Sequence, residues 1–163
     1  MRYILLLGGN IGDVDTTMDE AARKMLALGE IRQTSSTYES IAWGFESERR
    51  FRNRVVELSS KMDPFSLLER LQEIERELGR TEKTQKPEKY SDRTIDIDIL
   101  FCDRDVIQTP TLTIPHPRLH KRMFTLKPLM EHWSDMMHPL LMKTVRELHD
   151  ECTDEGFVRR VTQ

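Results

Sequence analysis

Cysteine is scarce in this sequence, and long apolar runs are missing from it. The two cysteines, Cys102 and Cys152, form neither a metal-ligand spacing nor a disulfide framework. No run approaches the roughly 18 apolar residues of a membrane-spanning helix, and no signal-peptide pattern precedes the apolar stretch Tyr3–Leu7. We therefore expect a protein of the reducing cytoplasm that has no membrane as a partner.

Net charge is also small, although charged residues are abundant. The 163 residues include 33 % charged side chains, yet their formal charges sum to only −3. This balance gives no argument for nucleic acid as a partner. The length predicts one domain, residues 1–163, that is large enough to bury a substantial core.

The stretch with the most chemical content is residues 93–101. Isoleucines alternate there with Asp96 and Asp98, and a period of two places both carboxylates on one face of a strand. Adjacent carboxylates repel each other unless a cation lies between them. Mg²⁺ suits such hard oxygen ligands and usually keeps water and substrate phosphates in its shell. The pattern therefore indicates magnesium-dependent phosphate chemistry, with a solvated edge strand as the alternative.

Apolar periodicity and capping residues predict the other elements. Helices are expected from Asp13 or Asp15 to about Leu28, and from Asp63 to about Leu78. The order β-α-β-β-α-β with a C-terminal extension is typical of an α+β, ferredoxin-like fold, an antiparallel sheet with both helices on one face. The other face is then open to carry a site. Strands are predicted over residues 3–7, 31–38, 51–58, 93–101 and 106–107, and short helical pieces over 117–121, 125–131 and 143–148.

Two segments are candidates for phosphate binding, and each has a structural alternative. Gly8–Gly12 follows a strand but lacks both glycine-rich nucleotide-binding spacings, so a strand-to-helix turn is favoured. Residues 80–93 carry basic side chains that suit a triphosphate. Acidic neighbours reduce their net charge, so a solvated loop is the alternative. The basic residues are Arg80, Lys83, Lys86, Lys89 and Arg93.

A histidine and several aromatic residues supply further candidates. His116 lies between two prolines, which restrict the backbone and can hold its ring toward a phosphate. Arg122 and Phe124 share a face if their segment is extended, so that one can contact a phosphate and the other can stack on a flat ring. Phe51 and Asn53 offer a ring and an amide on one strand face. Taken alone, each residue is better explained by core or surface packing.

Taken together and in this order, the motifs resemble those of a known enzyme family. They are Gly8-x-Asn10, Phe51-x-Asn53, Glu75 with Gly79-Arg80, Arg93-Thr-Ile-Asp96-Ile-Asp98-Ile-Leu, and Pro115-His116 with Arg122-x-Phe124. Over about residues 3–130 the chain resembles the 6-hydroxymethyl-7,8-dihydropterin pyrophosphokinases of folate biosynthesis. The resemblance implies transfer of the β,γ-pyrophosphoryl group of ATP to the pterin hydroxymethyl group, with release of AMP.

The resemblance also implies roles for individual residues. Two Mg²⁺ ions would be held by Asp96 and Asp98, with Arg80 and Arg93 as further catalytic residues. The implied partners are ATP and the hydroxymethyl dihydropterin alone, and we expect a monomer. The nucleotide site would consist of Gln72, Glu75, Arg93, Ile99, Thr113, His116 and Arg122. The pterin site would consist of Ser40, Ala42, Trp43, Phe51, Asn53, Asp96 and Phe124.

Some positions depart from the family pattern, and other functions remain as alternatives. Glu82 stands where many relatives have an arginine. Thr111 stands where an arginine on the nucleotide side is frequent, so the nucleotide contact of that arginine is predicted to be lost.

No residue has to be a general base, although Asp98 is the best candidate for a proton acceptor. A regulatory binding module would not need Asp96 and Asp98. A two-metal nuclease would need a basic surface, which a net charge of −3 does not supply.

Overall fold

A central antiparallel sheet organises the fold. The computed structural model describes residues 1–41, 50–79 and 94–161. The strand order is β10-β3-β4-β1-β5, and β2 also pairs with β4. All of these pairings are antiparallel. The strands are β1 (Arg2–Gly9), β2 (Glu30–Thr34), β3 (Tyr38–Ser40), β4 (Phe51–Ser59), β5 (Asp96–Cys102) and β10 (Val158–Arg160).

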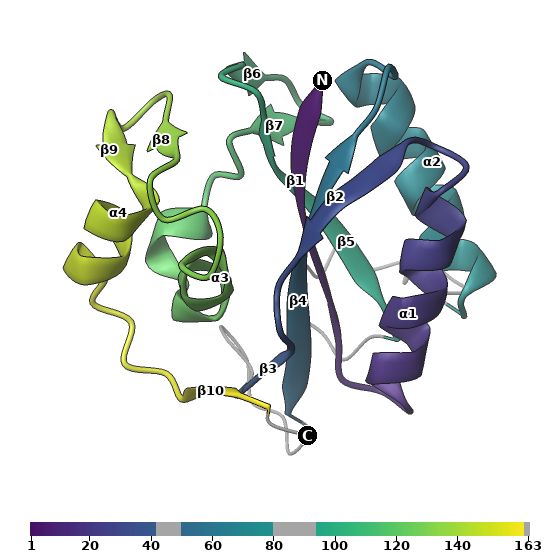
Figure 1. Ribbon diagram of the computed structural model, residues 1–163, viewed down its shortest axis with the longest axis horizontal. Coiled ribbons are helices and arrows are strands. Elements are labelled where there is room, and N and C mark those ends of the chain that lie inside the picture. Colours follow the sequence, from purple (N-terminus) through teal and green to yellow (C-terminus); the bar gives the residue numbers. More distant parts are fainter. Residues whose placement is uncertain (42–49, 80–93, 162–163) are drawn as a thin grey trace.

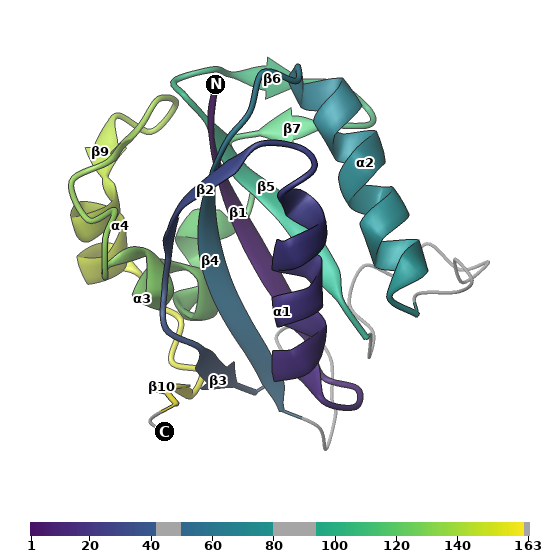
Figure 2. The ribbon, with the colours of Figure 1, turned by 45° about the vertical axis from the view of Figure 1, so that its right-hand side comes forward.

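Two helices cover one face of this sheet (Figures 1 and 2). α1 (Val14–Met25) begins after Asp13, whose carboxylate accepts a backbone N–H of the first turn. α2 (Pro64–Glu77) begins after Asp63, which accepts two such N–H groups, and a proline fits the first helical position because no N–H is needed there. Both helix starts are therefore as predicted.

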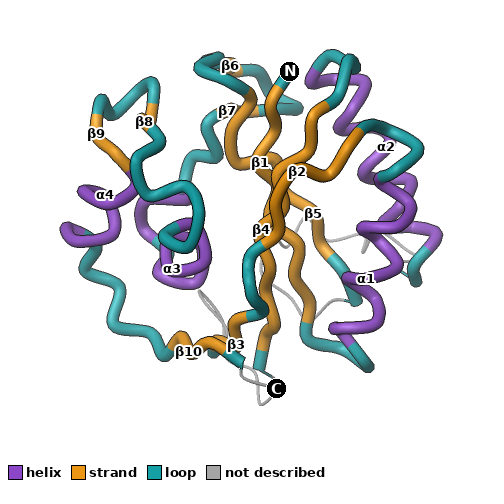
Figure 3. Tube along the Cα trace, viewed as in Figure 1, coloured by secondary structure: helices purple, strands orange, loops and turns teal. Residues whose placement is uncertain are grey.

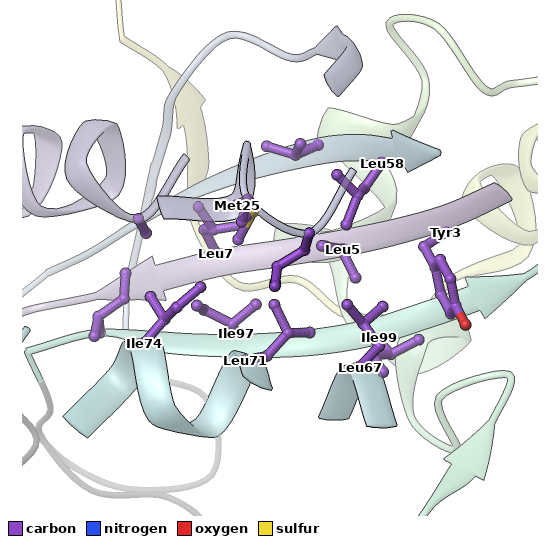
Figure 4. Close-up of a cluster of buried hydrophobic side chains, with 14 of the residues drawn as sticks. Tyr3, Leu5, Leu7, Met25, Leu58, Leu67, Leu71, Ile74, Ile97 and Ile99 are labelled. Atoms are coloured by element: carbon purple, nitrogen blue, oxygen red, sulfur yellow. The ribbon is translucent and has the colours of Figure 1, made fainter. Parts of the chain in front are cut away.

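The main core lies between these helices and the sheet. Apolar side chains from β1, β4, β5, α1 and α2 form one buried cluster, part of which Figure 4 shows. Ile97 and Ile99 of β5 belong to it, and each is only 4 % exposed. Because side chains alternate along a strand, Asp96 and Asp98 lie on the opposite face of the sheet.

The opposite face of the sheet carries the C-terminal part of the chain (Figure 1). η1 (Leu119–Lys121), α3 (Met123–Leu129) and α4 (Val145–Glu151) contribute there to a second buried cluster, which includes Phe101 and Trp133. This face is therefore open over only part of its area. Two hairpins complete the described fold, β6 (Ile107–Gln108) with β7 (Thr113–Ile114) and β8 (Met137–His138) with β9 (Lys143–Thr144).

The predicted strand over residues 31–38 is wrong in one respect, because it is divided into β2 and β3. Between them, the Ser35 hydroxyl accepts the Val55 N–H at 2.9 Å, and the Ser36 N–H donates to the Glu131 carboxylate at 3.0 Å. Side chains thus replace the regular ladder. The predicted helical pieces correspond to η1, α3 and α4, with boundaries that differ by up to three residues. Among the described residues, no helix has both the length and the apolar character needed to cross a bilayer.

Candidate active site

A pocket of about 420 Å³ lies where β1, β4 and β5 meet the segment between residues 110 and 124. It combines polar, charged and aromatic side chains from parts of the chain that are far apart in sequence. Most of the predicted site residues that the structure describes contribute to its lining. These are Ser40, Phe51, Asn53, Asp96, Asp98, Ile99, Thr113, His116, Arg122 and Phe124.

The two aspartates of β5 form the acidic part of the pocket. Asp96 and Asp98 are both partly exposed, whereas Ile97 between them is buried in the main core. The strand is held from behind by α2, because the Glu75 carboxylate accepts the Ile97 N–H at 2.7 Å. Glu75 is itself only 7 % exposed. This contact fixes the strand segment from which both aspartates project.

His116 lies beside this acidic part. Its Nε2 is 4.0 Å from Oδ2 of Asp98, and its backbone N–H donates to the Leu100 carbonyl at 3.0 Å. Its Nδ1 accepts the Arg118 N–H at 3.1 Å. A neutral imidazole that accepts at Nδ1 carries its proton on Nε2. The ring therefore presents a hydrogen-bond donor toward the carboxylate side of the pocket.

Arg122 and Phe124 stand next to each other on the C-terminal wall. Arg122 is 6 % exposed, and its guanidinium carbon lies 5.4 Å from the centre of the Phe124 ring. A cation over an aromatic face at this distance is attracted by the ring quadrupole. The pair thus holds one positive charge and one flat apolar surface at the rim of the same cavity.

The opposite wall is built by β3 and β4. Asn53 is 3 % exposed, and its amide nitrogen donates to the Ser40 hydroxyl at 3.1 Å. Phe51 lies opposite Ser40 in the strand register. The hydrogen bond fixes the amide plane, so the carbonyl oxygen of Asn53 has a defined direction.

Gly8, next to the end of β1, lies between two site residues, with Asn53 opposite it on β4 and Asp96 on β5. A Cβ at Gly8 would meet Oδ1 of Asn53 at 2.3 Å, so only glycine fits this position while Asn53 keeps its orientation. The interpretation of Gly8–Gly12 as a turn is therefore wrong for Gly8 and Gly9, which end β1.

Several predicted site residues do not line the described pocket. Gln72 is exposed on α2, and Glu75 is buried beneath β5. The sequence interpretation missed the part played by Gly8 and by Arg118, which also line the pocket. The position of Arg118 two residues after the proline-flanked histidine was the available signal. Outside the described residues lie Ala42, Trp43, Arg80, Lys83, Lys86, Lys89 and Arg93.

Comparison with known proteins gives a match over most of the chain. Residues 4–134 match the family model of 7,8-dihydro-6-hydroxymethylpterin-pyrophosphokinase (HPPK). The 2-amino-4-hydroxy-6-hydroxymethyldihydropteridine pyrophosphokinase of Aquifex aeolicus is 38 % identical over 151 residues, which are 93 % of this chain and 92 % of that protein. The protein of the same name from Porphyromonas gingivalis is 42 % identical over 138 residues, which are 83 % and 92 % of the two chains.

Solved structures share the fold. An HPPK-DHPS in complex with substrates has a TM-score of 0.68 and 16 % identity, covering 91 % of this chain and 43 % of that one. The Plasmodium falciparum HPPK-DHPS with pterin and p-hydroxybenzoate has a TM-score of 0.70 and 18 % identity, covering 92 % and 42 %. This chain thus spans less than half of either protein, and the likeness concerns the fold alone. On the family match and the close relatives, the chain belongs to the 7,8-dihydro-6-hydroxymethylpterin-pyrophosphokinase family, enzymes that transfer a pyrophosphoryl group from ATP to hydroxymethyldihydropterin in folate biosynthesis.

Proposed function

We propose that the described pocket binds ATP and 6-hydroxymethyl-7,8-dihydropterin together and carries out the pyrophosphoryl transfer between them. The observation that carries the proposal is the meeting, in one cavity, of a carboxylate pair, two nitrogen-bearing side chains that can donate hydrogen bonds to phosphate, and two aromatic rings. These are Asp96 and Asp98, His116 and Arg122, and Phe51 and Phe124, respectively.

Asp96 and Asp98 suit magnesium by their chemistry. Both offer hard oxygen donors from one strand face, and both are partly exposed. Among the described residues, no group of three or more His, Cys, Asp or Glu side chains is placed to enclose a metal ion. A carboxylate pair with open positions is what Mg²⁺ uses when water and phosphate oxygens complete its shell. We assign two Mg²⁺ ions to this pair, and when bound they would offset phosphate charge and favour deprotonation of a neighbouring hydroxyl.

The residues on the phosphate side position and stabilise the reacting groups. His116 donates its Nε2–H to a phosphate oxygen, and Arg122 offsets the negative charge of the triphosphate. The pterin hydroxymethyl oxygen attacks the β-phosphorus. The bond from that phosphorus to the oxygen of the α-phosphate breaks, and AMP leaves with the bonding electrons. The hydroxyl proton passes to a carboxylate, for which Asp98 is the candidate. Such a transfer depends mainly on positioning and charge stabilisation.

The pterin binds at the end of the pocket formed by β3, β4 and α3. Phe51 and Phe124 stack on its two faces, and the Asn53 amide, held by Ser40, pairs with the ring edge. Two partly exposed aromatic rings beside a buried amide suit a flat heterocycle with hydrogen-bonding edges. The roles of Ala42, Trp43, Arg80 and Arg93 stay predictions from the resemblance.

Nucleotide contacts are assigned to Ile99, Thr113 and His116, in addition to Arg122. We assign Glu75 an indirect role through the Ile97 N–H that it binds. For Gln72 the exposed position on α2 gives no support beyond the resemblance.

We further propose a ferredoxin-like topology for a single domain over residues 1–163. If β2 and β3 are counted as one interrupted strand, this strand is followed in the sheet by β4, β1 and β5. This order, with α1 and α2 as the connecting helices, supports that topology. β10 is then an added edge strand. A monomer in the cytoplasm, acting on small molecules without nucleic acid or membrane, is the accompanying proposal.

The decisive experiment incubates the protein with ATP, Mg²⁺ and the hydroxymethyl dihydropterin and measures AMP. Stoichiometric AMP and pterin pyrophosphate are expected, and AMP formation should stop when EDTA removes the divalent ion. Formation of ADP in place of AMP would contradict the proposed attack on the β-phosphorus. Undiminished AMP formation in EDTA would contradict the magnesium assignment.

A further inference from the structure

We infer that residues 153–161, here called the C-terminal strap, hold the two walls of the pterin end of the pocket at a fixed spacing, and that Asp154 is the positioning residue of this strap. The inference rests on the proposed pterin site. The strap lies beyond the family match, which ends at residue 134.

One end of the strap is attached to the start of α3. Oδ2 of Asp154 accepts the Met123 N–H at 2.9 Å, and its Oδ1 accepts the Gly156 N–H at 2.9 Å. Met123 stands between Arg122 and Phe124, which both line the pocket. The side chain of Arg122 makes no capping bond at this helix start, so a carboxylate 31 residues away supplies the acceptor. Asp154 thus fixes the backbone from which both pocket side chains project.

The other end of the strap is attached to β3. β10 pairs with β3 so that Val158 lies opposite Ser40, and the Ile41 N–H donates to the Phe157 carbonyl at 3.4 Å. Figure 3 shows β10 alongside β3. Ser40 and Ile41 line the pocket, and Ser40 also holds the Asn53 amide. The strap therefore reaches the wall that faces α3.

Charged contacts reinforce this second attachment. Arg159 of the strap and Arg50 each lie 3.2 Å from the Glu39 carboxylate, whose side chain is 14 % exposed. Burial alone would raise the pKa of Glu39, but the hydrogen bonds from these arginines hold the pKa below its usual value. The Arg50 guanidinium also lies 4.8 Å from the centre of the Phe157 ring. In addition, Lys127 of α3 donates to the Val158 carbonyl at 3.4 Å.

The strap therefore links the Phe124 wall to the Asn53 wall, and the pterin is the ligand that touches both. If the strap loosens, the spacing between these walls changes, and a ring bound between them loses contacts on one side. Among the proposed ATP contacts, Arg122 is also held by the strap through the Met123 N–H, whereas Ile99, Thr113 and His116 depend on β5 and the segment after it. The nucleotide therefore keeps most of its contacts when the strap loosens. Strap variants should for that reason weaken pterin binding more than nucleotide binding.

The test compares Asp154→Ala with Glu155→Ala, an exposed carboxylate one residue along the strap. Titration calorimetry with Mg²⁺ measures the Kd of the pterin and of a non-hydrolysable ATP analogue, below the thermal transition of each variant. We expect Asp154→Ala to weaken pterin binding about tenfold and ATP-analogue binding by less than about threefold, since the loss of charge-assisted hydrogen bonds displaces the wall. Asp154→Asn, which retains one acceptor oxygen, should recover most of the affinity.

Two results would overturn the inferred role of the strap. One is an equal loss of affinity for both ligands, and the other is a lower Tm without any change in the pterin Kd. If Asp154→Ala does not fold, Arg159→Ala tests the strap at its opposite attachment, where the side chain is exposed. It should raise the pterin Kd by about threefold, and an unchanged Kd would count against the strap. A wild-type protein that binds no pterin would instead refute the proposed function.

Discussion

At the scale of single residues, Asp96 and Asp98 are the side chains on which turnover should depend most. Changing either aspartate to asparagine should reduce AMP formation to background while leaving the fold intact, because one of the two proposed magnesium-binding carboxylates loses its charge but the β5 pairing is kept. Removal of the repulsion between neighbouring carboxylates should leave the metal-free Tm unchanged or slightly higher. AMP assays at saturating Mg²⁺, together with thermal unfolding, measure both effects.

The matched control is Asp105→Asn, which changes an exposed aspartate beyond the far end of β5. It should retain full activity. Near-normal AMP formation by either the Asp96 or the Asp98 variant would contradict the metal assignment.

The two aromatic rings of the pocket should matter for one ligand and not for the other. Phe51→Ala and Phe124→Ala are each expected to weaken pterin binding at least about tenfold, because stacking contributes roughly 0.5–1.5 kcal/mol beyond the burial of the ring. ATP-analogue affinity should change little. Calorimetric titration of both ligands checks this, with Phe65→Ala on the exposed side of α2 as control. Equal losses for pterin and nucleotide would mean that the rings only fill space.

At the scale of elements, the attachment of α2 to β5 fixes the strand that carries Asp96 and Asp98. Glu75→Ala should lower the free energy of unfolding by about 1.5–3 kcal/mol, because the buried Ile97 N–H loses a charged acceptor. The same change should lower kcat, since Asp96 and Asp98 flank Ile97. Urea unfolding and steady-state kinetics measure the two effects.

Glu75→Gln separates positioning from charge, because it keeps an acceptor oxygen for the same N–H. It should recover most of the kcat lost in Glu75→Ala. Glu73→Ala, on the exposed face of α2 where it pairs with Arg70 at 3.3 Å, is the control and should change neither quantity. A normal kcat for Glu75→Ala would show that β5 is positioned without this contact.

The elements that local patterns predicted are those whose cause is local. β5 was predicted because isoleucines and aspartates alternate within it, and α1 and α2 because Asp13 and Asp63 cap them. β10 was not predicted, since its three residues acquire strand geometry only by pairing with β3 about 120 residues earlier. The break at Ser35 likewise depends on Val55 and Glu131, which are distant in sequence.

At the scale of the whole molecule, the candidate site also combines features with a local cause, which the sequence predicts, and features with a distant cause, which it does not predict. The residue types were predictable from the motifs, because Asp96, His116, Arg122 and Phe124 occur in a recognisable order. Their support was not predictable, since it depends on long-range contacts that leave no local pattern. The bond from Glu75 to the Ile97 N–H and the bond from Asp154 to the Met123 N–H are examples.

The C-terminal half also introduces a dependence of stability on acid. His138 is 3 % exposed, and its Nδ1 accepts the N–H groups of Leu140 at 3.2 Å and Leu141 at 3.0 Å. Burial, together with the nearby His120 ring, lowers the pKa of His138 from 6.5 to about 4. Protonation would put a charge in a buried site and would remove the Nδ1 acceptor.

The sign of the effect follows from this lowered pKa. As pH falls below 6.5, the unfolded chain takes up the proton and the folded chain does not, so stability is complete above pH 6.5 and is lost progressively toward pH 4. The loss attributable to His138 should be at most about 3 kcal/mol.

Urea unfolding at pH 7.5, 5.5 and 4.5, comparing wild type with His138→Asn, isolates the contribution of His138, because asparagine keeps an acceptor without titrating. The variant should lose less stability than wild type over this range, while His132→Asn, at an exposed histidine, should behave as wild type. An identical loss in wild type and His138→Asn would assign the acid sensitivity to other groups.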